Sequence, residues 1–286
     1  IQIKMLNGRE KNGDLNINWK EYALGANHYK RKTVGFGKYD KREKEYEKEI
    51  FIREMSIIQG GIGCAIWDAA IIMSRWIYKH TQAFEGQRVL ELGSGVGLPG
   101  ILAAHYCDRI TLTDYLPPVS MIPYPLLENL QYNVDMNSKK ETLDGDDADD
   151  EEAARVNARM MDIKSKTEIK YLNWDEIDNV ADDERYDIIF GSELTYSLLS
   201  VDNLIKVIEK YLKPDGVFYE ILSDDRDGVS YFLEKMKERQ YKSHIVPVDN
   251  QYLGNYGTKQ REETYKFYTF MLNGGMAAAS SNRVLM

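Results

Sequence analysis

Residues 89–100 have the sequence VLELGSGVGLPG, in which a short apolar run passes directly into alternating glycines. An apolar helical pattern follows over Ile101 to Ala104. A buried strand that turns tightly into a helix presents unpaired backbone N–H groups and the positive end of the helix dipole. Glycine is needed where φ is positive or where a ligand touches the backbone. The stretch therefore predicts a strand, a cradle for a nucleotide-type ligand, and the start of a helix.

Two classes of ligand fit this pattern. Gly95, Gly97 and Gly100 match the spacing of the dinucleotide fingerprint. Counted from Glu91, the pattern is Glu-x-Gly-x-Gly-x-Gly, the signature of S-adenosylmethionine (SAM) methyltransferases. In that register Gly93 follows the strand directly, and the Glu91 carboxylate suits a cationic aminopropyl group but would repel a pyrophosphate. A tight turn without any ligand is the third alternative, so the surrounding chain has to decide.

Composition limits the classes of function. The chain has 286 residues, of which 43% are hydrophobic and 29% charged, and its net charge of −9 argues against a nucleic-acid partner. No apolar window is long enough to cross a bilayer, and the N-terminus lacks a signal-peptide pattern, so we expect neither a membrane-spanning nor a signal segment. We also expect a monomer. The two cysteines and four scattered histidines do not have the spacing of metal ligands. The low number of cysteines, both in apolar contexts, favours a reducing compartment, the cytosol or the nucleus.

Charge is unevenly distributed along the chain. Residues 1–50 hold 12 basic and 8 acidic side chains, whereas residues 138–155 hold 8 acidic and 3 basic ones. Both segments can be solvated surface, or the acidic one can attract a basic protein substrate. We predict an extended or hairpin-like charged arm over 1–48, a main domain over 49–272 with an acidic insertion at about 138–162, and a flexible tail over 273–286.

Strands alternate with helices through most of the main domain. This alternation predicts an α/β, Rossmann-like fold with a mostly parallel seven-stranded sheet, helices on both faces, and a C-terminal antiparallel hairpin. The expected strands of the sheet are 89–92, 109–113, 168–172, 186–191, 216–222, 243–248 and 264–272, the expected helices are 62–78, 124–137, 201–212 and 229–240, and a further strand is expected at 50–59.

Polar and aromatic residues follow several of these strands. Ligands of such sheets bind outside the carboxyl ends of the strands. Asp114 ends the second strand, 17 residues beyond Gly97, where a carboxylate can accept two hydrogen bonds from ribose hydroxyls. NAD has the same requirement, and a helix cap is the alternative role for Asp114. Trp174 ends the third strand, where it can stack on adenine or pack in the core.

These motifs resemble those of the seven-stranded, non-SET protein methyltransferases that modify lysine and, in related branches, histidine. The resemblance covers about residues 50–272 and includes Ile66-Trp67-Asp68-Ala69-Ala70 before the first strand. It implies a class I methyltransferase fold, SAM as cofactor with S-adenosylhomocysteine as product, and a protein substrate. The cofactor-binding residues that it implies are Trp67, Glu91, Gly93, Ser94, Gly95, Gly97, Asp114, Tyr115, Asn173, Trp174 and Ser192.

The acceptor motif departs from the usual pattern of this family. After the fourth strand the family has Asp-x-x-Tyr, whereas this chain has Glu193-x-x-Tyr196. By the resemblance, Glu193 and Tyr196 are the catalytic pair: Glu193 would orient an incoming lysine ammonium, and Tyr196 would shape the acceptor channel. The glutamate is closer to the histidine-modifying branch, where it would hold the imidazole N–H. We expect a protein-lysine N-methyltransferase; the alternatives are a histidine or small-molecule methyltransferase and a SAM-binding scaffold without turnover.

Overall fold

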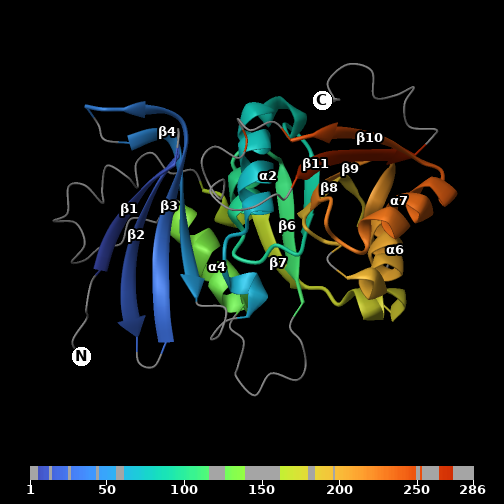
Figure 1. Ribbon diagram of the computed structural model, residues 1–286, viewed down its shortest axis with the longest axis horizontal. Coiled ribbons are helices and arrows are strands. Elements are labelled where there is room, and N and C mark those ends of the chain that lie inside the picture. Colours follow the sequence, from blue (N-terminus) through green and yellow to red (C-terminus); the bar gives the residue numbers. More distant parts are fainter. Residues whose placement is uncertain are drawn as a thin grey trace.

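The computed structural model describes residues 6–12, 15–24, 27–42, 45–55, 61–115, 126–138, 162–179, 184–195, 197–248, 252 and 264–272. These residues form two β-sheets with helices between them and further helices on the outer face of the larger sheet (Figure 1). None of the helices in the described ranges is long and apolar enough to span a membrane. The acidic insertion, the tail and Tyr196 were named from the sequence and lie outside the described residues, apart from the two ends of the insertion.

The larger sheet has seven strands in the order β10-β11-β9-β8-β5-β6-β7. Strands β9, β8, β5, β6 and β7 are parallel to one another, and β11 is antiparallel to both of its neighbours. The predicted sheet and its C-terminal hairpin are therefore confirmed. The bounds are β5 Arg88–Leu92, β6 Arg109–Asp114, β7 Thr167–Tyr171, β8 Tyr186–Ser192, β9 Leu212–Ser223, β10 Tyr241–Pro247 and β11 Tyr265–Leu272. Strand β9 begins at Leu212 rather than at Gly216, because Leu212 already pairs with Tyr186 across a register shift.

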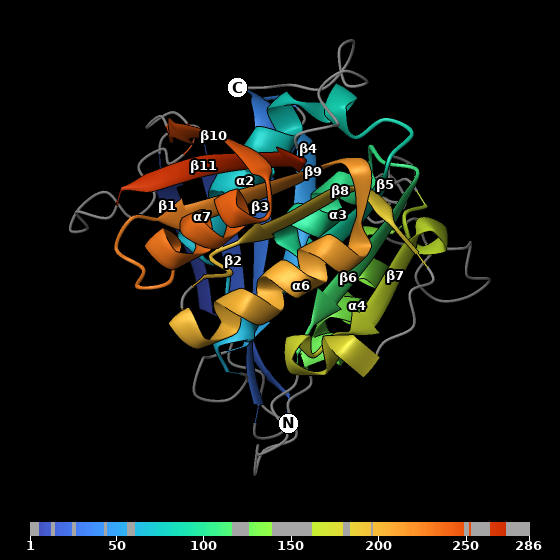
Figure 2. The same cartoon turned by 90° about the vertical axis from the view of Figure 1, so that its right-hand side faces the viewer.

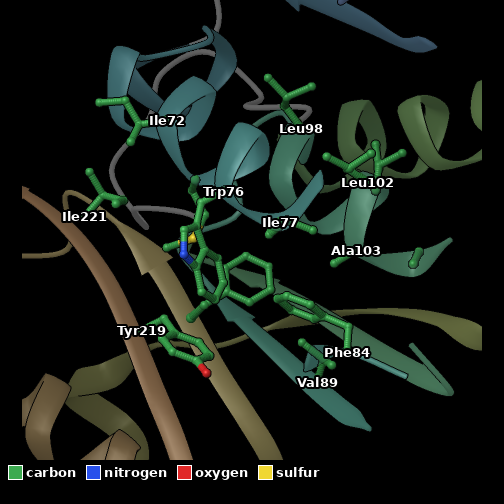
Figure 3. Close-up of a cluster of buried hydrophobic side chains, with 14 of the residues drawn as sticks. Ile72, Trp76, Ile77, Phe84, Val89, Leu98, Leu102, Ala103, Tyr219 and Ile221 are labelled. Carbon is green, nitrogen blue, oxygen red and sulfur yellow. The ribbon is translucent and has the colours of Figure 1, made fainter. Parts of the chain in front are cut away.

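Helices cover both faces of this sheet, as the alternating pattern predicted. Helices α2 (Asp68–Lys79), α3 (Leu98–Ala104) and α4 (Leu126–Asn137) lie on one face, and α6 (Val201–Tyr211) and α7 (Val229–Glu238) lie on the other (Figure 2). Neighbouring residues of β5 therefore enter different cores: Val89 packs with the first group of helices and Leu90 with the second. In the first core the Trp76 ring lies 4.7 Å from that of Tyr219 (Figure 3).

Helix α2 begins later than the sequence predicted. The expected helix started at Ile62, but residues Ile62–Cys64 form a single 3-10 turn and α2 starts at Asp68. Gly61 before this turn has φ of 77°, and Ala65 after it is extended, so the backbone cannot continue as one helix. Trp67 is the extended N-cap residue of α2. The break turns this segment toward the carboxyl edge of the sheet.

The N-terminal region forms a second, four-stranded antiparallel sheet in the order β1-β2-β3-β4. The strand predicted over 50–59 begins earlier, since β4 spans Glu45–Met55 and pairs with β3 along much of its length, and the predicted part after Met55 lies outside the described residues. Buried side chains of β3 and β4, including Val34 and Ile52, join the core of helices α2 and α3. Residue 48, the predicted end of the arm, therefore falls inside a strand, while the division into domains stays a prediction. The other bounds are β1 Leu6–Asn12, β2 Leu15–Leu24 and β3 Asn27–Asp40.

Candidate active site

The glycine loop joins β5 to α3 at the carboxyl edge of the larger sheet. Gly93, Gly95 and Gly97 all have left-handed backbone conformations, with φ of 61°, 54° and 86°. A Cβ atom on Gly97 would lie 2.4 Å from a methyl carbon of Leu130, and one on Gly93 would lie 2.9 Å from Leu194. Both the backbone conformation and the close packing therefore require glycine at these positions.

Ser94 and Asp114 attach this loop to β6. The Ser94 amide donates to the Thr113 carbonyl at 2.9 Å, and the Ser94 hydroxyl accepts from the Thr113 amide at 3.1 Å. The Asp114 carboxylate accepts hydrogen bonds from the amides of Gly95 and Tyr115, each at 2.6 Å. The two predicted site residues therefore fix the loop against the neighbouring strand.

The electrostatic state of Asp114 follows from its surroundings. Burial raises the pKa of its carboxyl group from 3.8 to about 6, although the hydrogen bonds from Gly95 and Tyr115 lower it. The group is therefore mostly ionised at pH 7. A carboxylate oxygen can accept more than one hydrogen bond, so Asp114 can still bind ligand hydroxyls while it holds both amides.

Glu91 is the second carboxyl group at the loop, and it is almost completely buried. Burial raises the pKa of Glu91 to about 8; the charge of Asp114 adds to the shift, and hydrogen bonds to Ser94 and Gly100 oppose it. Its Oε2 atom has no hydrogen-bond partner within the described part of the chain. A Cβ atom on Gly100 would lie 2.2 Å from this oxygen. The third glycine of the dinucleotide register therefore makes room for the Glu91 carboxyl group.

The segment before α2 covers the glycine loop. A Cβ atom on Gly95 would lie 2.9 Å from the carbonyl oxygen of Gly63, so the 3-10 turn approaches the loop at backbone level. The Trp67 indole donates to the Ile62 carbonyl at 3.0 Å, and its side chain remains 41% exposed. Trp67 therefore contacts the 3-10 turn that approaches the loop, and its role in binding a cofactor stays a prediction.

Residues after β7 also reach this edge. The Leu172 amide donates to the Asp114 carbonyl at 2.9 Å, which brings the next two residues near the end of β6. The Asn173 side chain accepts from the Asp175 amide at 3.0 Å and caps a short 3-10 helix, Trp174–Asn179. Trp174 is half-buried against the core of α6 and α7. Asn173 therefore has a local structural role, and Trp174 keeps part of its surface exposed.

Glu193 follows β8 directly and has a left-handed φ of 60°, which is uncommon for a residue other than glycine. Its Oε1 atom accepts a hydrogen bond from the Ser223 amide at 2.6 Å, and its Oε2 atom pairs with the Arg226 guanidinium. The preceding Ser192 hydroxyl is buried and has no hydrogen-bond partner among the residues that the structure describes. The carboxylate of Glu193 is therefore bound to the end of β9 in this structure.

Sequence reasoning missed three residues around Glu193. Ser223 and Arg226 lie about thirty positions further along the chain, and no local pattern connects them to β8. Glu220 was missed although it is the only charged residue within the apolar run 217–222, which is a recognisable signal of a specific role. Its Oε1 atom accepts from the Leu194 amide at 3.2 Å.

The chain is similar to known methyltransferases. The model of a lysine methyltransferase family matches residues 44–147 and 144–239. The chain is 29% identical to the EEF1A lysine methyltransferase 3 of Mus musculus over 217 residues, which are 73% of this chain and 79% of that protein. It is 24% identical to the protein N-lysine methyltransferase METTL21A of Danio rerio over 191 residues, 67% of this chain and 74% of that protein.

A histidine-modifying protein is also among the relatives. The histidine protein methyltransferase 1 homolog of Dictyostelium discoideum is 24% identical over 199 residues, 68% of this chain and 54% of that protein. Among solved structures, the 16S rRNA N2 G1207 methyltransferase of T. thermophilus has a TM-score of 0.48 and 13% identity, covering 84% of this chain and 50% of that one. Because the family model matches well over half of the residues, including both strands that carry the glycine loop and Asp114, the chain belongs to the lysine methyltransferase family.

Proposed function

We propose that the chain transfers a methyl group from SAM to the ε-amino group of a lysine in a protein substrate. Membership of the family supports the reaction class. The observation that carries the proposal to this chain is the pair of carboxyl groups, buried Glu91 and half-buried Asp114, at the two sides of the glycine loop. A site with these two acceptors suits a ligand that presents a cationic amino group and ribose hydroxyls.

The residues present fit SAM. The Oε2 atom of buried Glu91 has no partner in the described ranges, and the ammonium group of the cofactor can supply the donor that it needs. Asp114 would hold the ribose, Trp174 would face the adenine, and Trp67 would line the methionine part. Ser192 would lie beneath the cofactor, where its hydroxyl, which has no partner among the described residues, could donate or accept. The backbone of Gly93, Gly95 and Gly97 would be in contact with the ligand, since the loop has no side chains there.

The remaining requirement is to position and desolvate the acceptor nitrogen. The bound cofactor supplies an electrophilic methyl group on a sulfonium, and transfer is an in-line displacement that depends on placing two partners. Glu193 retains acceptor positions on its carboxylate, because Ser223 and Arg226 occupy only part of them. It can therefore orient a lysine amine, while Arg226 neutralises its charge. Tyr196, outside the described residues, stays the predicted wall of the acceptor channel.

A specific observation also favours histidine as the acceptor. The motif has Glu193 in place of the usual aspartate, as in the histidine-modifying branch that the sequence resembles, and a histidine methyltransferase is among the relatives. In that case Glu193 would accept the N–H of the nitrogen that is not methylated. The lysine assignment takes precedence because the family model is one of lysine methyltransferases, and so are two of the three relatives described above, including the one with the longest match.

The first experiment is calorimetric titration of the purified chain with SAM, S-adenosylhomocysteine and NAD. We expect binding of the first two and no binding of NAD. Asp114→Ala should abolish binding. Asp108→Ala is the matched control, because Asp108 is an exposed acidic residue just before the opposite end of β6. Binding of NAD alone would show that the glycine loop binds a dinucleotide and would contradict the proposal. Failure to bind any of the three ligands would also contradict it.

The second experiment identifies the acceptor. The chain is incubated with labelled SAM and a protein extract, and the labelled proteins are hydrolysed to amino acids. Labelled methyl-lysine would support the proposal, labelled methylhistidine would assign the alternative, and SAM binding without any labelled protein would indicate a scaffold or a small-molecule enzyme. EEF1A is the first purified protein to test, because the mouse relative is named for its methylation. A monomer in the cytosol or the nucleus stays a prediction.

A further inference from the structure

We propose that Glu220 is a positioning residue for methyl transfer, because it fixes the turn Ser192–Thr195. This turn carries Glu193, the residue that would orient the acceptor nitrogen. The inference rests on the proposed function. Glu220 lies on β9, opposite Gly191 of β8 in the parallel register. It does not touch the acceptor site itself but acts through the backbone of the turn.

Glu220 occupies a position where an apolar residue would be expected. Its side chain is 0% exposed, and its strand neighbours on the same face, Phe218 and Leu222, belong to the core of α6 and α7. Burial raises the pKa of its carboxyl group well above the ordinary value, and the nearby charge of Glu193 raises it further. Placing a carboxyl group in such a core is unfavourable unless it makes a needed contact.

The contact that Glu220 makes is with the backbone of the turn. Its Oε1 atom accepts from the Leu194 amide at 3.2 Å, while the Glu193 amide donates to the Ile221 carbonyl at 2.9 Å. The Leu194 side chain folds back over Gly191, where a Cβ atom would lie 2.3 Å from it. Two successive amides of the turn are thus held by two successive residues of β9, one through its backbone and one through its side chain.

Several unfavourable features are concentrated on this turn. Glu193 has a left-handed backbone. Of seven buried side-chain atoms without a hydrogen-bond partner in the described part of the chain, three belong to Ser192, Thr195 and Glu220. Strained and unsatisfied groups persist together where the surrounding structure maintains them for function. This concentration distinguishes Glu220 from a carboxyl group that merely satisfies one amide.

Three variants and a control test the proposal. Glu220→Gln keeps an acceptor oxygen at the same distance, Glu220→Met removes it, and Glu220→Asp keeps the carboxyl group but shortens its reach by one methylene. The control is Thr269→Val, because the Thr269 hydroxyl is also buried and without a partner in the part of the chain that the structure describes, but lies on β11, on the opposite face of the sheet. Each variant is measured for hydrogen exchange at the Leu194 amide, affinity for SAM, thermal stability, and kcat and KM with labelled SAM and EEF1A or whichever protein the extract experiment identifies.

We expect Glu220→Gln and Thr269→Val to match the unmodified chain within about twofold. Glu220→Met and Glu220→Asp should increase exchange at Leu194 and lower kcat by roughly tenfold or more, with affinity for SAM unchanged. Wild-type kcat in a Glu220→Met or Glu220→Asp variant with faster exchange would overturn the proposal, as would unchanged exchange. If the Glu220→Met variant does not fold, the comparison of Glu220→Asp with Glu220→Gln tests the proposal. Absence of methyl transfer by the unmodified chain would instead contradict the proposed function, and the exchange measurement would still report whether Glu220 holds the turn.

Discussion

The side-chain amide of Asn133 bonds both backbone groups of Arg53: its oxygen accepts from the Arg53 amide at 2.8 Å, and its nitrogen donates to the Arg53 carbonyl at 3.2 Å. Asn137, one helical turn further along α4, makes the same pair of bonds with Phe51. Asn129, one turn earlier, bonds the Arg53 side chain and carbonyl. Three asparagines four residues apart thus form a ladder that satisfies the outer edge of β4 as a further strand would.

This ladder also reaches the glycine loop, which gives the first prediction. The Asn133 amide group donates to the Val96 carbonyl at 2.9 Å. Asn133→Ala leaves that carbonyl and both backbone groups of Arg53 without this partner. We expect the free energy of unfolding to fall by about 2–4 kcal/mol and affinity for SAM to weaken. Chemical denaturation and calorimetry measure the two effects. Gln131→Ala, on the exposed face of the same helix, should change neither, and an equal effect of both substitutions would contradict the role of the ladder.

The second prediction separates backbone strain from packing in the glycine loop. Gly97 and Gly86 both have positive φ, but a Cβ atom on Gly97 would lie 2.4 Å from Leu130, whereas one on Gly86 would have open space around it. Gly86→Ala should lower the free energy of unfolding by about 1 kcal/mol through backbone conformation alone. Gly97→Ala adds the steric overlap and should cost about 2–4 kcal/mol. Equal costs by denaturant unfolding would show that the loop relaxes around the added methyl group.

The third prediction concerns the pH dependence of cofactor binding. Burial raises the pKa of Asp114 to about 6, so the carboxyl group is neutral below this pH and ionised above it. A raised pKa means that the folded chain is relatively more stable in acid and loses this contribution as the pH rises through about 6. The affinity for SAM depends on pH in the opposite direction, because the ribose hydroxyls of the cofactor donate to the ionised carboxylate of Asp114. Affinity for SAM should fall by about tenfold from pH 7 to pH 5.

Asp114→Asn is the control for this measurement. The amide does not ionise, so the affinity of this variant for SAM should be lower at pH 7 and should fall less between pH 7 and pH 5 than that of the wild-type chain. Glu91, whose pKa is raised to about 8, is protonated over this range in both chains, so a proton that it releases when the cofactor ammonium binds changes both affinities alike, and Asp114 accounts for the difference between the two curves. A wild-type affinity that stays constant between pH 5 and pH 7 would show that Asp114 does not bind the ribose as a carboxylate.

Local signals predicted the elements nearest the cofactor site. The apolar runs predicted β5 and β6 to within a residue, and the glycines predicted the loop after β5, although α3 begins at Leu98, three residues before the helical pattern that starts at Ile101. The β1–β4 sheet was predicted only in part, as an extended or hairpin-like arm and a strand at 50–59, since its strands are rich in charged residues and the outer edge of β4 bonds an asparagine ladder about eighty positions further on. Glu193 was identified, but its partners Ser223 and Arg226 depend on the register of β8 and β9, which no local pattern encodes.

The last prediction concerns the length of the Glu193 side chain. The additional methylene of glutamate, compared with aspartate, lets the carboxylate reach both the Ser223 amide and the Arg226 guanidinium. Glu193→Asp should lose at least one of these bonds, because a shorter side chain on the same left-handed backbone cannot span both partners. We expect kcat to fall by roughly 10- to 100-fold with affinity for SAM unchanged, since the acceptor is misplaced while the cofactor site is intact.

Arg226→Gln tests the same arrangement from the other side, and Asp225→Asn, at an exposed neighbouring acidic residue, is its control. Without the guanidinium, the charge of Glu193 is no longer neutralised, and the carboxylate attracts a lysine ammonium more strongly. Deprotonation of the substrate then becomes harder, because an adjacent negative charge raises the pKa of an amine. The rate of methyl transfer by Arg226→Gln should therefore reach its maximum at a higher pH than that of the unmodified chain. An unchanged pH profile, with full activity in Glu193→Asp, would show that this ion pair only supports the fold.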